Sequence, residues 1–257
     1  MPLSLPQFLP AEIFAFMAVF IRMGAAFVVL PGFGEAVVPA RMRLMMALAI
    51  TLVVVPIVRA TLPPMPSTPG TLVAFVFTES AIGFFLGGMA RLMVTTLDTA
   101  GMIISTQIGL STATIFNPAL QSTGTLPSVL LSLGGLVAIF ETNMHHLLLE
   151  GLVDSYTLFK PTDPLPVGDF SDAVARLIAS SFRVGVQIAM PFIVLSLLFT
   201  FALGLISRLM PTLQIFFVSV PLQLGGGMLI VVLAMSAMMT LFLTYFQETL
   251  LGLMSVR

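Results

Sequence analysis

DTAGMIISTQIGLSTATIFNPALQSTGT, residues Asp98 to Thr125, is the segment around which this chain is best interpreted. After Asp98 no charged residue appears until Glu141, although Ser, Thr, Gln, Asn and Gly are frequent in the first part of that gap. A lipid-facing helix carries fewer hydroxyls and glycines, and a water-exposed loop carries charges. The composition therefore predicts backbone held at membrane depth, where other protein shields it or where it lines a cavity.

Small residues recur at every fourth position of this segment. On a helix they form one smooth stripe that another backbone can approach closely. The stripe consists of Gly101, Ser105, Gly109 and Ala113. The helix should end at Asn117-Pro118, because proline disfavours helical geometry in the residue before it. Ile115 and Phe116 are then expected at the tip of a packed, uncharged segment.

The composition of the whole chain is that of an integral membrane protein or of a buried subunit in a membrane complex. Hydrophobic residues make up 58% and charged residues 8%, whereas soluble domains carry about 25% charged residues. A net charge of −1 with scattered basic residues offers no face for nucleic acid. The lack of cysteine excludes disulfides and thiolate metal sites. We expect no cofactor, no metal site and no catalytic residue.

Long apolar segments predict an all-α fold of membrane-associated helical hairpins. The third of these segments carries Gly83 and Gly87 at a spacing typical of close helix packing. The second is short for a bilayer crossing, which needs about 20 residues. The segments lie at about Phe8–Leu30, Leu44–Val58, Thr71–Thr96 and Leu126–Leu149.

The C-terminal part predicts a helical hairpin. Residues 184–207 and 209–247 are free of charge, and Arg208 stands alone between them. An arginine at mid-bilayer is costly, so Arg208 and Pro211 are expected to mark the turn. The second arm would be about 50 Å long as a straight helix, which exceeds the hydrocarbon core. It should therefore bend or break at Pro221 and Gly225-Gly226-Gly227.

Charged residues inside the apolar segments leave an ion-coupled membrane transporter open as an alternative. Glu12 with Arg22, and Glu79 with Arg91, are too far apart in sequence to be ion pairs within one helical turn. We expect these four side chains at interfaces or paired with other subunits.

Two further patterns suggest chemistry, and each is weak. Gly109-Leu110-Ser111-Thr112 matches the Gly-x-Ser-x of intramembrane serine proteases, with His145 or His146 as the conceivable base. Glu141 and His145 lie at i and i+4, as metal ligands can, but no third ligand has a matching spacing. A polar helix end at the membrane surface explains this second pattern better.

Four stretches, in order along nearly the whole chain, resemble the FliR family of export-gate subunits in flagellar type III secretion. They are RMGAAFVVLPGFGEAVVPARMR (22–43), AGMIISTQIGLSTATIFNP (100–118), residues 143–154, and LGLISRLMPTLQIF (203–216). The resemblance implies one export-gate domain over residues 1–257, with a FliP-like part at 1–183 and a FliQ-like hairpin at 184–257. It further implies a place in a helical hetero-oligomeric gate of the bacterial inner membrane, within the flagellar basal body.

The same resemblance implies partners and a role for the central segment. The partners are FliP-like, FliQ-like and FlhB-like subunits, unfolded export substrates and membrane lipid, with no nucleic acid. In the family, the loop matching 109–118 projects into the lumen and plugs it. The plug candidates in this chain are Leu110, Ile115 and Phe116, with Gly109, Asn117 and Pro118 shaping the loop. The expected function is therefore a closed channel for polypeptides, without catalysis; the transporter and, less favoured, the protease remain alternatives.

Overall fold

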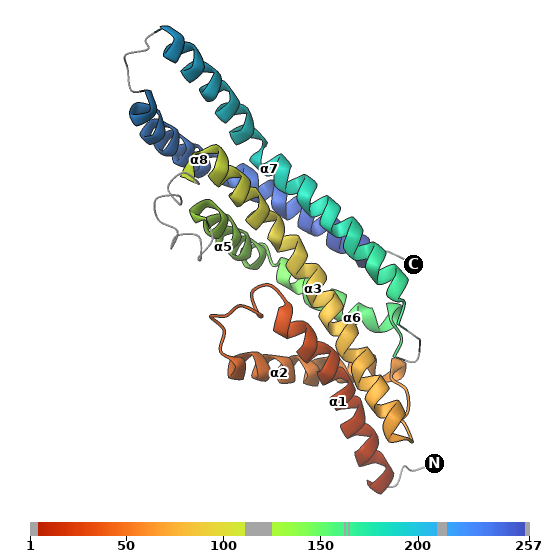
Figure 1. The fold of residues 1–257 in the computed structure, drawn as a ribbon. Coiled ribbons are helices and arrows are strands. Elements are labelled where there is room, and N and C mark those ends of the chain that lie inside the picture. Colours follow the sequence, from red (N-terminus) through yellow and green to blue (C-terminus); the bar gives the residue numbers. More distant parts are fainter. Residues whose placement is uncertain (1–4, 111–124, 162, 164, 210–214, 255–257) are drawn as a thin grey trace. The chain divides into compact units, whose positions relative to one another are not determined.

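A computed structural model describes residues 5–110, 125–161, 163, 165–209 and 215–254, and within these ranges every regular element is helical (Figure 1). The all-α prediction is thereby confirmed. The elements are α1 (Leu5–Val29), α2 (Ala40–Val58), a short 3-10 helix η1 (Arg59–Thr61), α3 (Pro69–Gln107), α5 (Leu126–Glu141), α6 (Met144–Leu158), α7 (Val167–Leu209) and α8 (Ile215–Met254).

Helices of the described part are long and apolar enough to cross a membrane. Five qualify by length and composition: Pro10–Val29, Ala40–Thr61, Pro69–Gln107, Val167–Leu209 and Ser219–Leu253. The number rises to six if α5 and α6, which are joined by a short break, together form one span. The chain is thus a membrane protein with several candidate spans, as its composition predicted.

The chain folds into two compact units. The first unit comprises Met1–Met93, Asn143–Leu177 and Glu248–Arg257, and the second comprises Val94–Thr142 and Ile178–Gln247. The helices α3, α7 and α8 contribute residues to both. The boundaries of these two compact units differ from the predicted boundary between residues 183 and 184. The division into a FliP-like part and a FliQ-like hairpin stays a prediction.

In the first unit, α1 and α3 pack closely through glycines. A Cβ atom on Gly83 would lie 2.3 Å from the carbonyl oxygen of Arg22, and one on Gly87 would lie 2.7 Å from that of Ala26. No side chain fits at either distance, so both glycines are required for this contact. The prediction that Gly83 and Gly87 mark close helix packing is confirmed.

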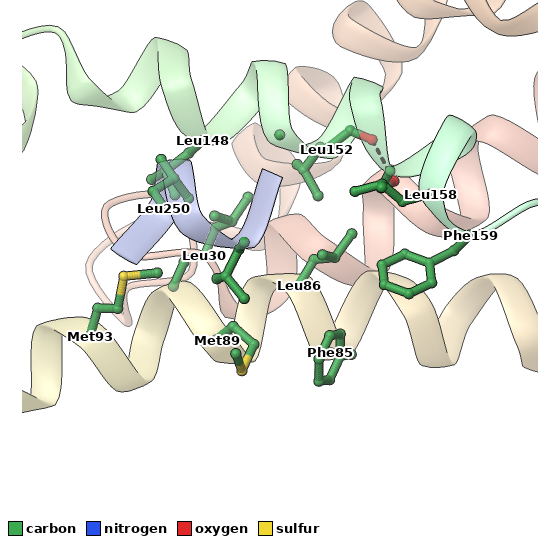
Figure 2. Close-up of a pocket in the computed structure, with 14 residues that line it drawn as sticks. Leu30, Phe85, Leu86, Met89, Met93, Leu148, Leu152, Leu158, Phe159 and Leu250 are labelled. Carbon is green, nitrogen blue, oxygen red and sulfur yellow. Dashed lines mark hydrogen bonds between the residues drawn. The ribbon is translucent and has the colours of Figure 1, made fainter. Parts of the chain in front are cut away.

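In the first unit, α6 and the C-terminal end of α8 also pack near α3. Figure 2 shows Phe85 and Met89 of α3 on one side of a small cavity, with Leu152 of α6 on the other and Leu250 of α8 nearby. The cavity has a volume of about 70 Å³ and an almost entirely apolar lining. It is a packing gap, since it is much smaller than the about 300–1,000 Å³ of typical ligand sites.

In the second unit, α7 and α8 run side by side, as the predicted C-terminal hairpin requires (Figure 1). The hydroxyl group of Tyr245 on α8 lies 2.8 Å from the hydroxyl of Ser181 and 3.2 Å from that of Ser180, both on α7. Arg208 lies in the last turn of α7, where the helix dipole favours a cation. Pro211 lies outside the described residues.

Two helices differ from their predicted lengths. The second segment is longer than expected, because α2 begins at Ala40 rather than at Leu44, and with η1 it reaches the 22 residues of a candidate span. The single helix predicted over 126–149 is instead two helices. It is interrupted at Asn143, whose φ of 58° lies in the left-handed region that a helix cannot contain.

Of the bend or break predicted at Pro221 and Gly225–Gly227, the break is wrong. The helix α8 is uninterrupted from Ile215 to Met254 and contains all four residues. Proline removes a single backbone hydrogen bond, which a long packed helix tolerates. At least one of the glycines serves packing, because a Cβ on Gly227 would lie 2.4 Å from Cγ2 of Ile108.

Candidate functional site

The candidate site is the point where the uncharged central segment leaves α3. The helix predicted to continue to Asn117-Pro118 ends at Gln107 instead. The amide of Ile108 still donates to the carbonyl of Ile104 (2.9 Å), whereas that of Gly109 donates to Thr106 (3.3 Å). Gly109 has a φ of 81°, which glycine adopts without strain and which is typical of the residue after a helix. Gly109 therefore ends the helix.

The end of α3 is held by α8. The Nε2 atom of Gln223 donates to the carbonyl oxygen of Gln107 at 2.7 Å. The last carbonyls of a helix have no partner within the helix, so this side chain satisfies one of them. Gly227, one turn further along α8, makes room for Ile108. A cavity of about 140 Å³ lies beside this contact, lined by Gln107, Gln223 and apolar residues of α7 and α8.

The structure describes the chain again from Thr125, the residue directly before α5. The Oγ1 atom of Thr125 accepts a hydrogen bond from the amide of Ser128 (3.4 Å) and so caps the helix. It also donates to the carbonyl of Gly101 at 3.5 Å. A Cβ atom on Gly101 would lie 2.2 Å from Cα of Ser128, so α3 and α5 touch backbone to backbone there. Both ends of the central segment are consequently fixed within the second unit.

A carboxylate lies close to the second of these anchors. The Oγ of Ser128 donates to Oδ1 of Asp98 at 3.3 Å, and the Oγ of Ser132 donates to the same atom. Hydroxyl groups thus satisfy a half-buried carboxylate of α3. Sequence reasoning did not identify Gln223 or these two serines. The signal was available for Gln223, since it is a polar side chain in the charge-free second arm of the hairpin.

Some of the predicted site residues lie in α3 or directly after it, and the others lie outside the described residues. Gly101 and Ser105 are buried in α3, and Gly109 follows it. The proposed four-residue stripe therefore ends before Gly109, because that residue has left the helix. Leu110 is half-buried at the last position before the gap. Ser111, Ala113, Ile115, Phe116, Asn117 and Pro118 lie outside the described residues.

The charged residues expected at interfaces or with other subunits are paired inside the chain. Nε and Nη2 of Arg22 bind both carboxylate oxygens of Glu79, at 2.7 and 2.9 Å, and both side chains are fully buried. The guanidinium also donates to Oγ of Ser155 and to the carbonyl of Phe159, each at 3.1 Å. It lies 3.9 Å from the centre of the Tyr156 ring. This network joins α1, α3 and α6 of the first unit.

The other two charges of the predicted set also have partners. Glu12 forms an ion pair with Arg59, and Arg91 forms one with Glu35. The prediction that these four side chains lie at interfaces or pair with other subunits missed partners within the chain that are distant in sequence, among them Arg59 of η1 and Glu35 in the connection between α1 and α2. Over the part of the chain that the structure describes, no cluster of three His, Asp or Glu side chains could hold a metal ion.

The sequence is similar to bacterial export proteins over nearly its full length. Residues 13–249 match the family described as Bacterial export proteins, family 1. The chain is 40% identical over 239 residues to the flagellar biosynthetic protein FliR of Caulobacter vibrioides, covering 93% of this chain and 95% of that protein. It is 29% identical to the FliR protein of Bacillus subtilis, with 92% of each chain covered.

A relative from a different system matches over a shorter region. The Yop proteins translocation protein T of Yersinia pestis is 30% identical over 179 residues, which are 66% of each chain. The family match, over residues 13–249, includes both the end of α3 and Gln223 of α8. This chain belongs to the FliR family of bacterial export proteins, membrane components of the flagellar and related type III export apparatus.

Proposed function

We propose that this chain is a structural and gating subunit of the flagellar type III protein export apparatus. It helps to form a closed channel through which unfolded substrates enter, in the bacterial inner membrane and within the flagellar basal body. FliP-like, FliQ-like and FlhB-like subunits complete the assembly. Similarity to flagellar FliR proteins extends over more of the chain than similarity to the Yersinia protein, which favours the flagellar system.

The observation that carries the proposal is the pair of anchors around the central segment. From Gly109 to Thr125 no charged residue occurs. The segment begins at the end of α3, where Gln223 donates a hydrogen bond to Gln107. It ends at Thr125, the cap residue of α5, which donates a hydrogen bond to the carbonyl of Gly101. An uncharged segment with both ends fixed to a helical scaffold suits a plug, because its two attachments retain it and it offers no charge to passing ions.

The gating mechanism depends on apolar side chains. Leu110, Ile115 and Phe116 fill a narrow lumen and exclude water, as hydrophobic constrictions do in channels. Such side chains form no fixed hydrogen bonds, so they part for an unfolded polypeptide and close again behind it. Gly109, Asn117 and Pro118 supply the backbone geometry of the loop. In this proposal the energy for transport comes from other parts of the apparatus.

Ion conductance of the assembled complex tests this function. Replacing Ile115 and Phe116 with glycine removes the apolar volume, and the complex should then leak ions across a planar bilayer. The matched control carries Ile115→Leu and Phe116→Leu, which keep most of the apolar volume and should keep the channel closed. Equal conductance of the glycine variant and the unmodified complex would refute the plug.

The alternatives make different predictions. A serine protease would lose cleavage but keep its assembly when Ser111 is replaced by alanine. A transporter would lose ion flux, in reconstituted protein without partners, when Glu79 or Arg91 is neutralised. The ion pairs of these two residues favour a structural role for them, since each charge already has an opposite charge beside it.

A further inference from the structure

We propose that the groove between α1, α2 and α3 binds an anionic phospholipid, with an acyl chain in the groove and the phosphate beside Arg41 and Arg43. The site lies wholly within the first unit and does not depend on the gating proposal.

The groove is large and apolar. Its volume is about 470 Å³, within the about 300–1,000 Å³ typical of sites for small molecules. Phe20, Gly24 and Val28 of α1 form one wall, and Leu44 of α2 and Phe84 of α3 contribute to the others. Gly24 leaves this wall open, because a Cβ atom there would meet only the ring of Phe20, at 4.0 Å.

The walls belong to candidate membrane spans, so hydrocarbon is the medium that the groove is expected to meet. The helices α1, α2 and α3 each contain such a span. Leu44 and Phe84 are about half exposed, at 51% and 48%.

One end of the groove carries positive charge without a matching carboxylate. Arg43 lines this end and is held by the backbone: Nε donates to the carbonyl of Phe33 (3.2 Å) and Nη2 to that of Glu35 (3.1 Å). Arg41 is exposed in the same helical turn. Over the described ranges, neither arginine forms a salt bridge, and the nearby carboxylate of Glu35 is bound to Arg91.

The position of the two arginines in α2 strengthens the argument for an anion. Both lie in the first turn, which contains no acidic residue, and the cap residue Pro39 offers no side-chain hydrogen bond. Cations at the start of a helix are opposed by the helix dipole, and a phosphate group nearby removes that penalty. The turn also opens the candidate span Ala40–Thr61, directly after the short connection from the span Pro10–Val29, and the ends of spans are where lipid headgroups are expected. The apolar groove matches the acyl chain of an anionic phospholipid, and the cationic end of the groove matches its phosphate group.

Tryptophan fluorescence provides a direct test, because the chain contains no tryptophan. Phe84→Trp places a reporter in the groove, and Leu44→Trp provides a second one on α2. Phe182→Trp is the matched control, since Phe182 is exposed on α7 outside the groove. Each full-length variant is reconstituted in vesicles of phosphatidylcholine with increasing amounts of phosphatidylglycerol or phosphatidylcholine, both brominated on their acyl chains.

We expect brominated phosphatidylglycerol to quench both groove reporters at a lower mole fraction than brominated phosphatidylcholine does. The difference should be about fivefold for each arginine, and the Phe182→Trp control should show no such preference. Arg41→Gln should lower the preference about fivefold. Gly24→Leu, which fills the groove and leaves both arginines in place, should abolish the preferential quenching.

Three results would overturn the site. The first is equal quenching of a groove reporter by the two lipids. The second is a preference that survives both Arg41→Gln and Gly24→Leu. The third is protection of the groove reporters from all lipid by a co-purifying protein chain, which would mean that a protein occupies the groove.

Discussion

Neutralising Glu79 should destabilise the protein strongly, because it leaves a charged guanidinium in the interior. Glu79→Gln keeps the shape of the side chain and removes the charge that both nitrogen contacts of Arg22 use. The remaining partners of Arg22 are the hydroxyl of Ser155, the carbonyl of Phe159 and the ring of Tyr156. All three are neutral, so none of them replaces the lost carboxylate.

The expected magnitude follows from burial. Arg22 and Glu79 are both 0% exposed, and removing one partner of a buried pair costs about 3–5 kcal/mol. The pair of Glu12 with Arg59 is the natural comparison, since its side chains are 33% and 40% exposed. Exposed pairs contribute about 0–1 kcal/mol. Glu12→Gln should therefore have a several-fold smaller effect than Glu79→Gln.

The measurement is the free energy of unfolding of each variant in a mild detergent, with circular dichroism as the signal. A double variant, Arg22→Met with Glu79→Leu, separates the loss of the pair from the stranding of one charge. It should lose less stability than Glu79→Gln alone, because no unpaired charge remains buried. Similar losses for Glu79→Gln and Glu12→Gln would refute the reasoning, as would a double variant that loses the sum of its single substitutions.

Two further substitutions test the anchors of the central segment. Gly101→Ala should lose about 1–3 kcal/mol of unfolding free energy, because its Cβ would overlap the backbone of Ser128. Gly88→Ala on the same helix meets no atom within 4 Å, so it should gain about 0.5–1 kcal/mol, and an equal loss at both sites would contradict the close contact. Gln223→Leu removes the hydrogen bond to Gln107 and should speed amide exchange at the end of α3 about fivefold. Unchanged exchange there would show that this hydrogen bond does not hold the helix end.

Local patterns in the sequence were sufficient to predict the fold class. Apolar length and the scarcity of charge predicted the helices. The spacing of Gly83 and Gly87 predicted a close helix contact, which α1 provides. Each of these features depends on a few adjacent residues and on the period of one helix, so no knowledge of distant partners was needed.

Features that depend on distant residues were not predictable in this way. The four-residue spacing of the small residues in the central segment is the same whether Gly109 packs within a helix or ends it. The structure shows that Gly109 ends the helix, and the side chain that binds this helix end, Gln223, lies on another helix. The partner of Arg22 was missed for the same reason, since Glu79 is far away in sequence and one turn from Gly83. Pairing across helices is a property of packing, and a linear pattern does not contain it.

The two units differ in the interactions that satisfy polar groups within their apolar helices. Polar groups inside apolar helices need partners, and the first unit supplies them with a buried ion pair whose disruption costs about 3–5 kcal/mol. In the second unit, both anchors of the central segment are neutral hydrogen bonds, such as the one from the amide of Gln223 to the carbonyl of Gln107. A neutral hydrogen bond contributes about 1 kcal/mol, so thermal motion breaks it far more often. In the proposed gate, the segment that must yield to a substrate is thus held by weak bonds, and the charged network stabilises helices that have no need to move.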